Sequence, residues 1–599
     1  MYKFEPLEKF HKSVRGALKE NELCVLRVNA DSDECYIEIV KDGGKPSAFS
    51  MLKKDGYFET EVKFQEAGLY FYRFSAGGIY IGETDKKPCV SYDAGYFQLL
   101  VYDKDFVTPD FIKGNIIYQI FPDRFAASGE VKRIEGRVYH KDLYEDPYFM
   151  PDENGKVRNV DFYGGNLKGI TGKLDYLKSL SVGIIYLNPI FKARSNHRYD
   201  TGDYFEIDPN LGNVDDLITL IKEAAKRDIK IILDGVFSHT GDDSRYFNKY
   251  GNYDSVGAYQ SKDSPYYKWY SFAEYPDKYA SWWGIDVLPE TNELEPSYRE
   301  FITGENGVIE KYLKLGIGGW RLDVADELPD EFLEALRARA KTVNKEAVII
   351  GEVWEDASNK IAYDKRRKYF YGKELDSVMN YVAKNAVIDY VKTRNAQKFV
   401  TEMNLLSDHY PKEALDACMN FLGTHDTWRI ISSLSDCDFS ELTKEEQSGV
   451  KLYGTEYDKS VKRLKTAALI LYTICGSPSV YYGDEIGQQG LTDPLNRRFF
   501  GADGVNGEIL SHYILLGKIR RFIPALKDGE LNFVYSDEDS FVYERRSDED
   551  VCFIAVNGGK STLKIAFEGT LYDLVSGEKY ENSCEIKAEK NALLYKKPL

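Results

Sequence analysis

Four carboxylates each follow a short apolar run in the middle of the chain. Asp234 ends Lys-Ile-Ile-Leu-Asp, Asp323 ends Gly-Gly-Trp-Arg-Leu-Asp, Glu352 ends Val-Ile-Ile-Gly-Glu, and Asp426 ends Phe-Leu-Gly-Thr-His-Asp. A single acid at a strand end is more often a solvated loop residue or a helix cap. Four of them favour a shared site, because barrel enzymes keep their chemistry at the carboxyl ends of the strands.

The spacing around two of these acids suits paired acid chemistry. Arg321 and Asp323 are two apart on an expected strand, so they share a face, and the guanidinium is expected to keep Asp323 ionised as a nucleophile. Glu352 and Trp354 share a face by the same rule, and an indole that limits hydration favours a protonated general acid. Retaining glycoside hydrolysis uses such a pair, with the carboxyl groups about 5–5.5 Å apart.

Three of the seven histidines lie beside these segments, namely His197, His239 and His425. A histidine in such a place is more often a packed or surface residue. A neutral imidazole can also donate a hydrogen bond to a sugar hydroxyl, which would account for all three.

The acids need a scaffold of parallel strands, and the middle of the chain has that texture. Short apolar runs alternate with helical segments, such as 214–228, which Asn213 opens with Asp216 as its capping partner. Eight such units would close into a (β/α)8 TIM barrel, with a lobe inserted at about 240–300. The expected strands lie near 116–121, 183–188, 230–235, 318–323, 347–352, 376–381, 421–425 and 478–482.

The two ends of the chain read as β structure. Apolar and charged residues alternate in 58–64, and similar runs occur at 35–40, 69–74, 551–556 and 562–567. We therefore expect an N-terminal β-sandwich over 1–105, a catalytic barrel over 106–522 and a C-terminal β-sandwich over 523–599.

Composition excludes several function classes. The chain has 599 residues, with 79 Lys and Arg against 97 Asp and Glu, a net charge of −18, and no run of basic residues. Nucleic acid and anionic membranes are therefore poor partners. The longest apolar stretch, 467–475, is too short to span a bilayer, and the start of the chain has no signal-like apolar core. Eight scattered cysteines without a CxxC pair favour a reducing, cytoplasmic location.

These motifs resemble the α-amylase family, glycoside hydrolase family 13. Four segments match its short conserved regions in order and spacing, and three more are similar to its neopullulanase, cyclomaltodextrinase and maltogenic amylase branch, which carries an extra N-terminal β domain. The first four are Asp234–His239, Gly319–Asp326, Gly351–Trp354 and Thr424–Asp426, and the other three are Ile117–Phe125, Phe162–Gly169 and Ser195–Thr201.

The resemblance assigns roles to individual residues. It implies Asp323 as nucleophile, Glu352 as general acid/base and Asp426 as the carboxylate that grips sugar hydroxyls. The other implied contacts bind the same sugar or brace its site, and Trp354 is a candidate platform for a further sugar, as are Trp282, Trp283 and Trp428. These substrate-binding residues are Arg321, His239, His425, His197, Tyr199 and Asp200. The ring of Tyr199 is implied as a stacking platform for the sugar, and Asp200 as a brace of the site.

The implied function is retaining hydrolysis of α-1,4, and also α-1,6, glucosidic bonds in maltodextrins, cyclodextrins or pullulan. The alternatives are a maltodextrin glucosidase or an amylopullulanase-like debranching enzyme with transglycosylation. A non-catalytic carbohydrate-binding relative would not need Arg321, Asp323 and Glu352 together.

Two further expectations concern a metal and a partner. Ala126, Ala127 and Ser128 stand where calcium-binding relatives place Asn and Asp ligands, although Gly164 and Asn166 still match part of that loop. The calcium site is incomplete, and we expect no cofactor. In the resembled branch the N-terminal domain often packs over a partner's active site, which implies a homodimer.

Overall fold

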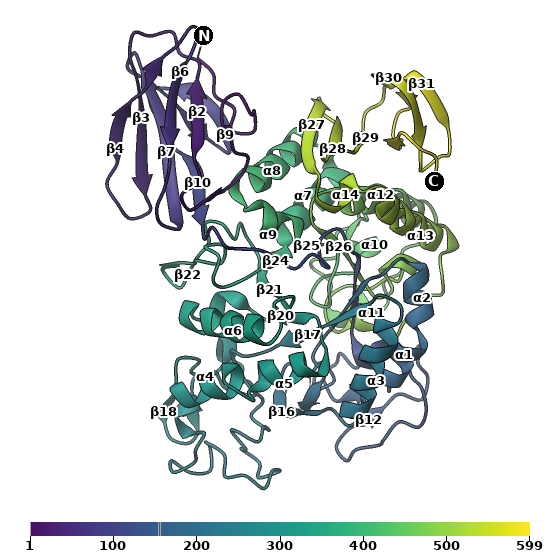
Figure 1. Ribbon diagram of the computed structural model, residues 1–599. Helices are drawn as coiled ribbons and strands as arrows, with labels where there is room; N and C mark the ends of the chain where they lie inside the picture. Colours follow the sequence, from purple (N-terminus) through teal and green to yellow (C-terminus); the bar gives the residue numbers. More distant parts are fainter. Residues whose placement is uncertain (1, 154, 156, 158) are drawn as a thin grey trace.

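The computed structural model describes residues 2–153, 155, 157 and 159–599. Eight parallel strands close into a barrel at the centre of the molecule (Figure 1), which confirms the expected architecture. In barrel order they are β11 (Ile117–Ile120), β14 (Ile184–Leu187), β17 (Lys230–Gly235), β20 (Gly319–Leu322), β21 (Val348–Val353), β24 (Ser377–Asn380), β25 (Met419–Phe421) and β26 (Ser477–Tyr481).

The strands form where apolar runs can be buried on both faces. Every residue of β11, β14, β20 and β21 is buried, as parallel strands covered by helices require. The seventh strand is shifted from the expected 421–425, because only Met419–Phe421 pair with β26. The residues that follow leave the ladder as a turn, and this turn carries His425 and Asp426.

Helices surround the barrel. Asn213 and Asp216 form the expected capping box of α3, which ends at Ala225 rather than at 228. The helices are α1 (Leu167–Gly172), α2 (Leu174–Ser179), α3 (Val214–Ala225), α4 (Pro296–Thr303), α5 (Val308–Leu315), α6 (Asp330–Val343), α7 (Tyr381–Thr393), α8 (Ala396–His409), α9 (Lys412–Asp416), α10 (Ile430–Ser433), α11 (Lys444–Ser448), α12 (Gly454–Thr473), α13 (Gly507–Phe522) and α14 (Ala525–Asp528).

Short elements decorate the loops of the barrel. The segment between β17 and α4 holds β18, β19 and two single turns of 3-10 helix, and it projects beyond the barrel strands (Figure 1). These elements are β12 (Val138–Tyr139), β13 (Asp161–Phe162), β15 (Phe191–Ala193), β16 (Thr201–Ile207), β18 (Phe272–Glu274), β19 (Lys278–Tyr279), β22 (Ile361–Ala362), β23 (Lys365–Arg366), η1 (Pro122–Arg124), η2 (Tyr267–Trp269), η3 (Trp282–Gly284), η4 (Ala325–Glu327), η5 (Asp484–Ile486) and η6 (Leu495–Arg497).

Two sheets form the N-terminal sandwich. Their inward side chains, such as Leu26 and Phe58 of one sheet and Phe74 and Phe97 of the other, share one apolar core. The larger sheet holds β1 (Leu18–Lys19), β3 (Cys35–Lys41), β4 (Ser47–Ser50), β7 (Gly68–Ala76), β8 (Ile79–Thr84), β9 (Lys87–Ser91) and β10 (Phe97–Tyr102), and the smaller holds β2 (Cys24–Val28), β5 (Leu52–Lys53) and β6 (Phe58–Val62).

The C-terminal strands are hydrogen-bonded as one six-stranded sheet with two buried faces. Phe541 and Tyr543 join the core of the barrel, whereas Val542 and Leu594 pack with Cys584 on the other side. The sheet order is β27 (Glu530–Ser536), β28 (Ser540–Arg546), β29 (Val551–Asn557), β32 (Asn591–Tyr595), β30 (Leu563–Asp573) and β31 (Lys579–Ile586).

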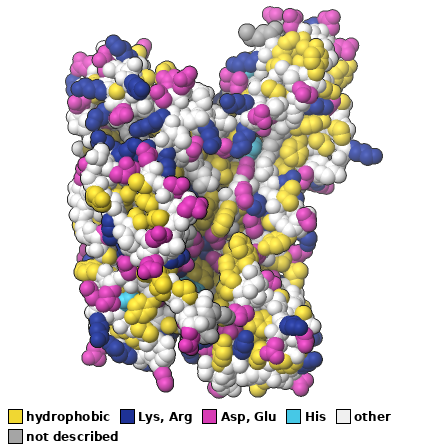
Figure 2. All heavy atoms as spheres, turned by 180° about the vertical axis from the view of Figure 1, so that it is seen from behind, with side chains coloured by type: hydrophobic (Ala, Val, Ile, Leu, Met, Phe, Trp, Pro, Cys, Tyr) yellow, Lys and Arg dark blue, Asp and Glu magenta, His cyan; other side chains and the backbone are white. Residues whose placement is uncertain are grey.

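The surface seen from behind mixes acidic, basic and apolar side chains without a broad patch of one charge, and it is hollowed along its middle (Figure 2). Within the described parts of the chain, no helix has both the length and the apolar character needed to cross a membrane.

Candidate active site

One buried arginine joins three of the strand-end carboxylates. The Nη1 atom of Arg321 lies 2.8 Å from Oδ1 of Asp234 and 2.8 Å from Oδ1 of Asp323, and its Nη2 lies 2.8 Å from Oε2 of Glu352. The side chains come from three neighbouring strands, β17, β20 and β21, whose ladder places Asp234 beside Arg321. Asp323 and Glu352 therefore contact two different nitrogen atoms of the same guanidinium group.

The backbone after the nucleophile position is strained. Val324 has φ 37° and ψ 57°, a left-handed conformation that a β-branched residue rarely adopts. In this conformation the N–H of Val324 donates a hydrogen bond of 2.9 Å to Oε2 of Glu352. The strain thus serves to tie the loop after β20 to the carboxyl group on β21.

The indole next to Glu352 acts differently from the expectation. Trp354 is 53% exposed, and its Nε1–H donates to Oε1 of Glu352 at 3.1 Å. The hydroxyl of Tyr381 donates to the same oxygen at 3.3 Å. Trp354 therefore orients Glu352 by a hydrogen bond instead of shielding it from water, because the polar edge of the ring faces the carboxyl group.

Tyr199, His425 and Asp426 form the opposite wall of the site. The rings of Tyr199 and His425 are stacked, with centroids 5.3 Å apart, and the Tyr199 hydroxyl lies 2.6 Å from Nε2 of His425. Nδ1 of His425 accepts from Nε2 of Gln119 at 3.0 Å, which places the imidazole proton on Nε2. Asp426 lies 3.1 Å from that nitrogen, and its side chain is 41% exposed.

The remaining expected residues take supporting positions. Nδ1 of His197 accepts from the backbone N–H of Tyr199 at 3.1 Å, and the carboxylate of Asp200 accepts from the backbone N–H of Ser195 at 3.0 Å. His239 is buried, its ring is 5.4 Å from that of Trp282, and its Nε2 has no hydrogen-bond partner among the described residues. Trp428 instead packs against Phe439.

Several contacts of the site were not expected from the sequence. The hydroxyl groups of Tyr186 and Tyr199 both donate to Oδ2 of Asp234, at 2.6 and 2.9 Å. Arg497 lies 3.3 Å from Asp426 and donates to the backbone carbonyl of His425. Tyr186 could have been suspected, because it lies near the carboxyl end of an apolar strand. Arg497 stands in a loop without a distinguishing local pattern.

The charge balance of the site favours a bound proton. Burial raises the pKa of Asp323 well above its usual range, and repulsion by Glu352 and Asp234 adds to this, whereas Arg321 opposes it. Burial also raises the pKa of Asp234. Asp426 is partly exposed, but loss of hydration within the site raises its pKa to about 7, and repulsion by Glu352 adds to this. The expectation that Arg321 alone keeps Asp323 ionised is therefore too simple, because its single charge is shared by three carboxylates.

The three histidines are neutral near pH 7. Burial lowers the pKa of His197 to about 3 and that of His239 to about 4, and it lowers the pKa of His425 well below its usual value. Neutral imidazoles can donate or accept hydrogen bonds without adding charge to the site.

In the loop that resembles a calcium-binding loop, Asn166 serves as a helix cap. The side-chain oxygen of Asn166 accepts from the backbone N–H of Gly169 at 2.8 Å and caps α1, while its Nδ2 donates to the carbonyl of Ser128. The alanines at 126 and 127 offer no side-chain oxygen. No cluster of three or more metal-binding side chains is found among the residues that the structure describes.

Comparison with known families agrees with this geometry. The family described as "Alpha amylase, catalytic domain" matches residues 119–512, which is more than half of the chain. The chain belongs to the α-amylase family. The matched segment of this α-amylase family member contains every barrel strand except the first two residues of β11.

Individual relatives place it in one branch of that family. A cyclomaltodextrinase from Thermoanaerobacter pseudethanolicus is 30% identical over 98% of both chains. An amylopullulanase from Thermoanaerobacter thermohydrosulfuricus is 33% identical over 95% of this chain and 43% of its own length. The chain spans half or less of the length of the amylopullulanases that it matches. The structural match to the solved type III pullulan hydrolase from Thermococcus kodakarensis covers both chains in full, with a TM-score of 0.71 and 25% identity.

Proposed function

We propose that this α-amylase family member is a retaining α-glucan hydrolase. The observation that carries the proposal is the contact of both Asp323 and Glu352 with the guanidinium of Arg321. A shared guanidinium keeps two carboxyl groups close together, as the retaining mechanism requires. Asp323 lies at the end of a buried strand, where a sugar can approach it only from the open mouth of the barrel.

The reaction proceeds by double displacement. Glu352 donates its proton to the glycosidic oxygen as the bond from C1 to that oxygen breaks, and an oxygen of Asp323 forms an ester bond to C1. Water then gives a proton to Glu352 while its oxygen attacks C1, which breaks the ester and returns Asp323 as a carboxylate. Both displacements invert C1, so the α configuration is retained. Asp426, with Arg497 behind it, binds sugar hydroxyls of the same glucose.

The proposed substrates are maltodextrins, cyclodextrins and pullulan, with α-1,4 and also α-1,6 bonds cleaved. Full-length similarity to a cyclomaltodextrinase and to a pullulan hydrolase supports the first activity. The 33% identity to an amylopullulanase supports α-1,6 cleavage as a second candidate activity. Transglycosylation shares the ester intermediate, because a sugar hydroxyl can replace water in the second step.

The test is a product profile on maltotriose, β-cyclodextrin, pullulan and starch. Release of α-configured maltose or glucose from maltotriose and cyclodextrin supports the hydrolase, and release of β-configured products overturns the retaining mechanism. From pullulan, panose indicates α-1,4 cleavage and maltotriose indicates α-1,6 cleavage. Absence of turnover on all four substrates would refute the proposed function.

We further propose that the enzyme works without calcium. The engagement of Asn166 as a helix cap supports this, because it removes an oxygen ligand from the loop. Incubation with EDTA should leave both the melting temperature and the activity unchanged. Loss of either that is restored by added calcium would contradict the proposal.

A homodimer through the N-terminal sandwich and a cytoplasmic location complete the proposal. Edge strand β4 is exposed along its length, and Phe49 on it is exposed together with Leu52 on β5. Light scattering should give twice the monomer mass, and Phe49→Asp should return the monomer.

All eight cysteines are free, which supports a reducing compartment. Cell fractionation tests the location.

A further inference from the structure

Three side chains meet at the mouth of the barrel outside the site described above. Trp283 of η3 donates its Nε1–H to Oε1 of Glu327 in η4 at 2.9 Å. Tyr363, in the turn between β22 and β23, reaches the same carboxylate with its hydroxyl. One acid therefore joins two aromatic rings that come from different loops.

Both rings are exposed although their backbones are constrained. Trp283 is 72% exposed and Tyr363 is 70% exposed, and each has a φ of 50°. Left-handed backbone at bulky residues is uncommon and needs support from the surrounding structure. Large exposed aromatic rings held in place in this way mark a binding surface more often than a packing contact.

The rings continue from the active site. Trp282 is stacked on Trp283 with ring centroids 5.3 Å apart, and the other neighbour of Trp282 is the ring of His239, 5.4 Å away. Glu327 is four residues after Asp323, and the β22–β23 hairpin follows the strand that carries Glu352. The cluster thus lies over the β17, β20 and β21 part of the barrel.

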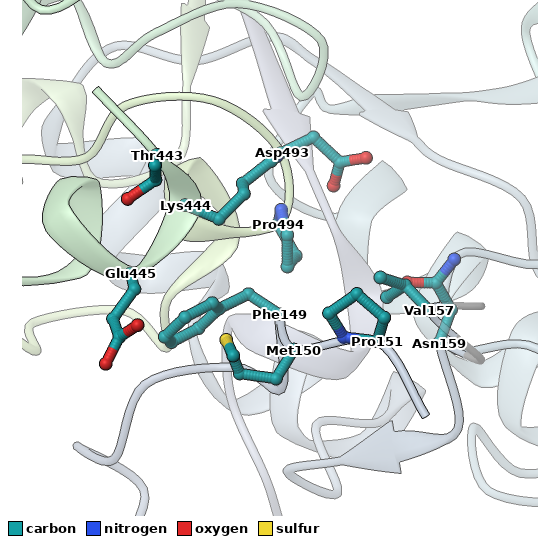
Figure 3. Close-up of a pocket in the computed structure, with 10 residues that line it drawn as sticks. All are labelled: Phe149, Met150, Pro151, Val157, Asn159, Thr443, Lys444, Glu445, Asp493 and Pro494. Carbon is teal, nitrogen blue, oxygen red and sulfur yellow. The ribbon is translucent and has the colours of Figure 1, made fainter. Parts of the chain in front are cut away.

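A separate cavity of about 500 Å³ lies over the opposite part of the barrel mouth. Its walls come from the loops after β11, β25 and β26, with Phe149 and Met150 facing Lys444 and Asp493 (Figure 3). Asp493 pairs with Arg497, which contacts Asp426. The aromatic cluster and this cavity therefore flank the catalytic carboxylates from two sides.

Glu352 lies on the side of the cleaved bond from which the leaving saccharide departs, because it protonates the glycosidic oxygen that leaves with this saccharide. The loop directly after the Glu352 strand holds Trp354 and then Tyr363. A sugar that leaves next to Glu352 would therefore be followed by a further sugar near Tyr363 and Trp283. Sugar rings present apolar faces to aromatic side chains, and their hydroxyl groups can donate to the Glu327 carboxylate.

The N-terminal sandwich fastens the hairpin that carries Tyr363. Nε and Nη2 of Arg366 lie 2.8 and 3.4 Å from the two carboxylate oxygens of Asp42, which follows β3. Asn359 donates to the side chain of Gln98 on β10 at 2.6 Å. On the barrel side, Lys360 pairs with Asp326 at 3.0 Å. The hairpin is thus held between two domains of the same chain.

We propose that Trp283, Tyr363 and Glu327 form an outer platform for the saccharide on the leaving side of the cleaved bond. Asp42 positions Tyr363 in this platform through its contact with Arg366. The inference rests on the proposed hydrolase function and adds to it a determinant of chain length. Trp283, Tyr363 and Glu327 contact the substrate, whereas Asp42 and Arg366 are positioning residues.

The first experiment compares two substrates in Trp283→Ala and Tyr363→Ala. Maltohexaose can fill the platform, whereas α-maltosyl fluoride places no sugar there. Each variant should lower kcat/KM for maltohexaose about three- to tenfold, which is the loss expected for one aromatic contact. The kcat/KM for the fluoride should stay within about twofold of the wild-type value. Equal losses on both substrates, or no loss on either, would overturn the platform. Tyr453→Ala, at an 83% exposed ring before α12, is the matched control and should change neither value.

The second experiment tests the role of the N-terminal sandwich. Asp42→Asn and Arg366→Gln should each raise KM for maltohexaose while kcat for the fluoride stays unchanged, and the double variant should be no worse than either single variant. Additive losses would show that the two residues act independently and would contradict the positioning role. Arg27→Gln, which breaks an ion pair inside the sandwich, is the control.

These outcomes separate the inference from the proposed function. A wild-type chain that turns over neither substrate refutes the hydrolase itself. A wild-type chain that turns over both, with variants that keep the wild-type ratio, refutes only the platform.

Discussion

At the scale of residues, Arg321 decides how the site is charged. It contacts three carboxylates from three strands, so its single positive charge cannot neutralise them all. The proposed role of Asp323 as nucleophile needs its carboxyl group ionised, and burial opposes this by raising its pKa. The site therefore holds charge at the expense of stability, as functional sites often do.

The first prediction concerns Asp323 and Glu352, the two carboxyl groups that are proposed to react. Asp323→Asn should lower kcat by about a thousandfold or more on both maltohexaose and α-maltosyl fluoride. Glu352→Gln should do so for maltohexaose but should spare ester formation from the fluoride, because fluoride leaves without a proton. The melting temperature of Asp323→Asn should be equal to or above that of the wild type, since a buried charge is removed. Turnover of maltohexaose near the wild-type level in either variant would rule out its assigned role.

The second prediction concerns Glu374, a buried carboxyl group outside the site. Neither of its oxygens has a hydrogen-bond partner among the described residues, and burial raises its pKa to about 8. The protonated form favours the fold, so this contribution is complete below the ordinary pKa of 4.5 and is lost as the pH rises through about 8. Glu374→Gln should therefore raise the melting temperature at pH 8 and have little effect at pH 4.5. A pH-independent difference would contradict this reasoning.

At the scale of elements, the loops that follow the strands carry the chemistry and the helices support them. The loop after β20 holds Asp323, Val324 in its left-handed conformation and Glu327 within five residues. The helices lie outside, and several of them, such as α1, α3 and α13, begin with a side-chain cap. Function and stability are therefore separable along one βα unit.

The capping box of α3 provides the third prediction. Asn213 accepts from the backbone N–H groups of Asp215 and Asp216, and Asp216 returns a bond to the backbone of Asn213. Asn213→Ala should lower the free energy of unfolding by about 1 kcal/mol and leave kcat/KM unchanged. Chemical denaturation and maltotriose kinetics measure the two effects. Asn213→Ser is the control, because serine can cap the same helix.

At the scale of the whole molecule, the N-terminal sandwich is fastened to the barrel by buried polar contacts. Nζ of Lys12 lies 2.6 Å from Oδ1 of Asp408 in α8, and both side chains are almost fully buried. The Asp42 to Arg366 pair makes a second connection near the active site. The sandwich is thus a structural part of the catalytic unit.

The fourth prediction tests the buried connection. Lys12→Met should lower the free energy of unfolding by about 3–5 kcal/mol, because it leaves Asp408 buried without its partner. Adding Asp408→Asn to the Lys12→Met variant should restore part of the loss. If the single variant unfolds like the wild type in urea, the pair does not hold the domains together.

The sequence alone determined the barrel, the positions of seven of its eight strands and the carboxylates at their ends. These features are local, since apolar runs of four to six residues, turn residues and acids at fixed offsets lie within a few positions of one another. The pairing of Arg321 with Asp323 follows from the two-residue period of a strand, and the structure has it. The cap at Asn213 was equally readable.

Only the tertiary structure decided which distant residues contact one another in and around the site. The contacts of Arg321 with Asp234, of His425 with Gln119 and of Arg366 with Asp42 join residues 87, 306 and 324 positions apart. No local pattern encodes such pairs, because they depend on how the strands close into a ring and how the sandwich docks. Trp354 was misjudged for the same reason, since its spacing fixes the face it shares with Glu352 but not which edge of the indole meets the carboxyl group.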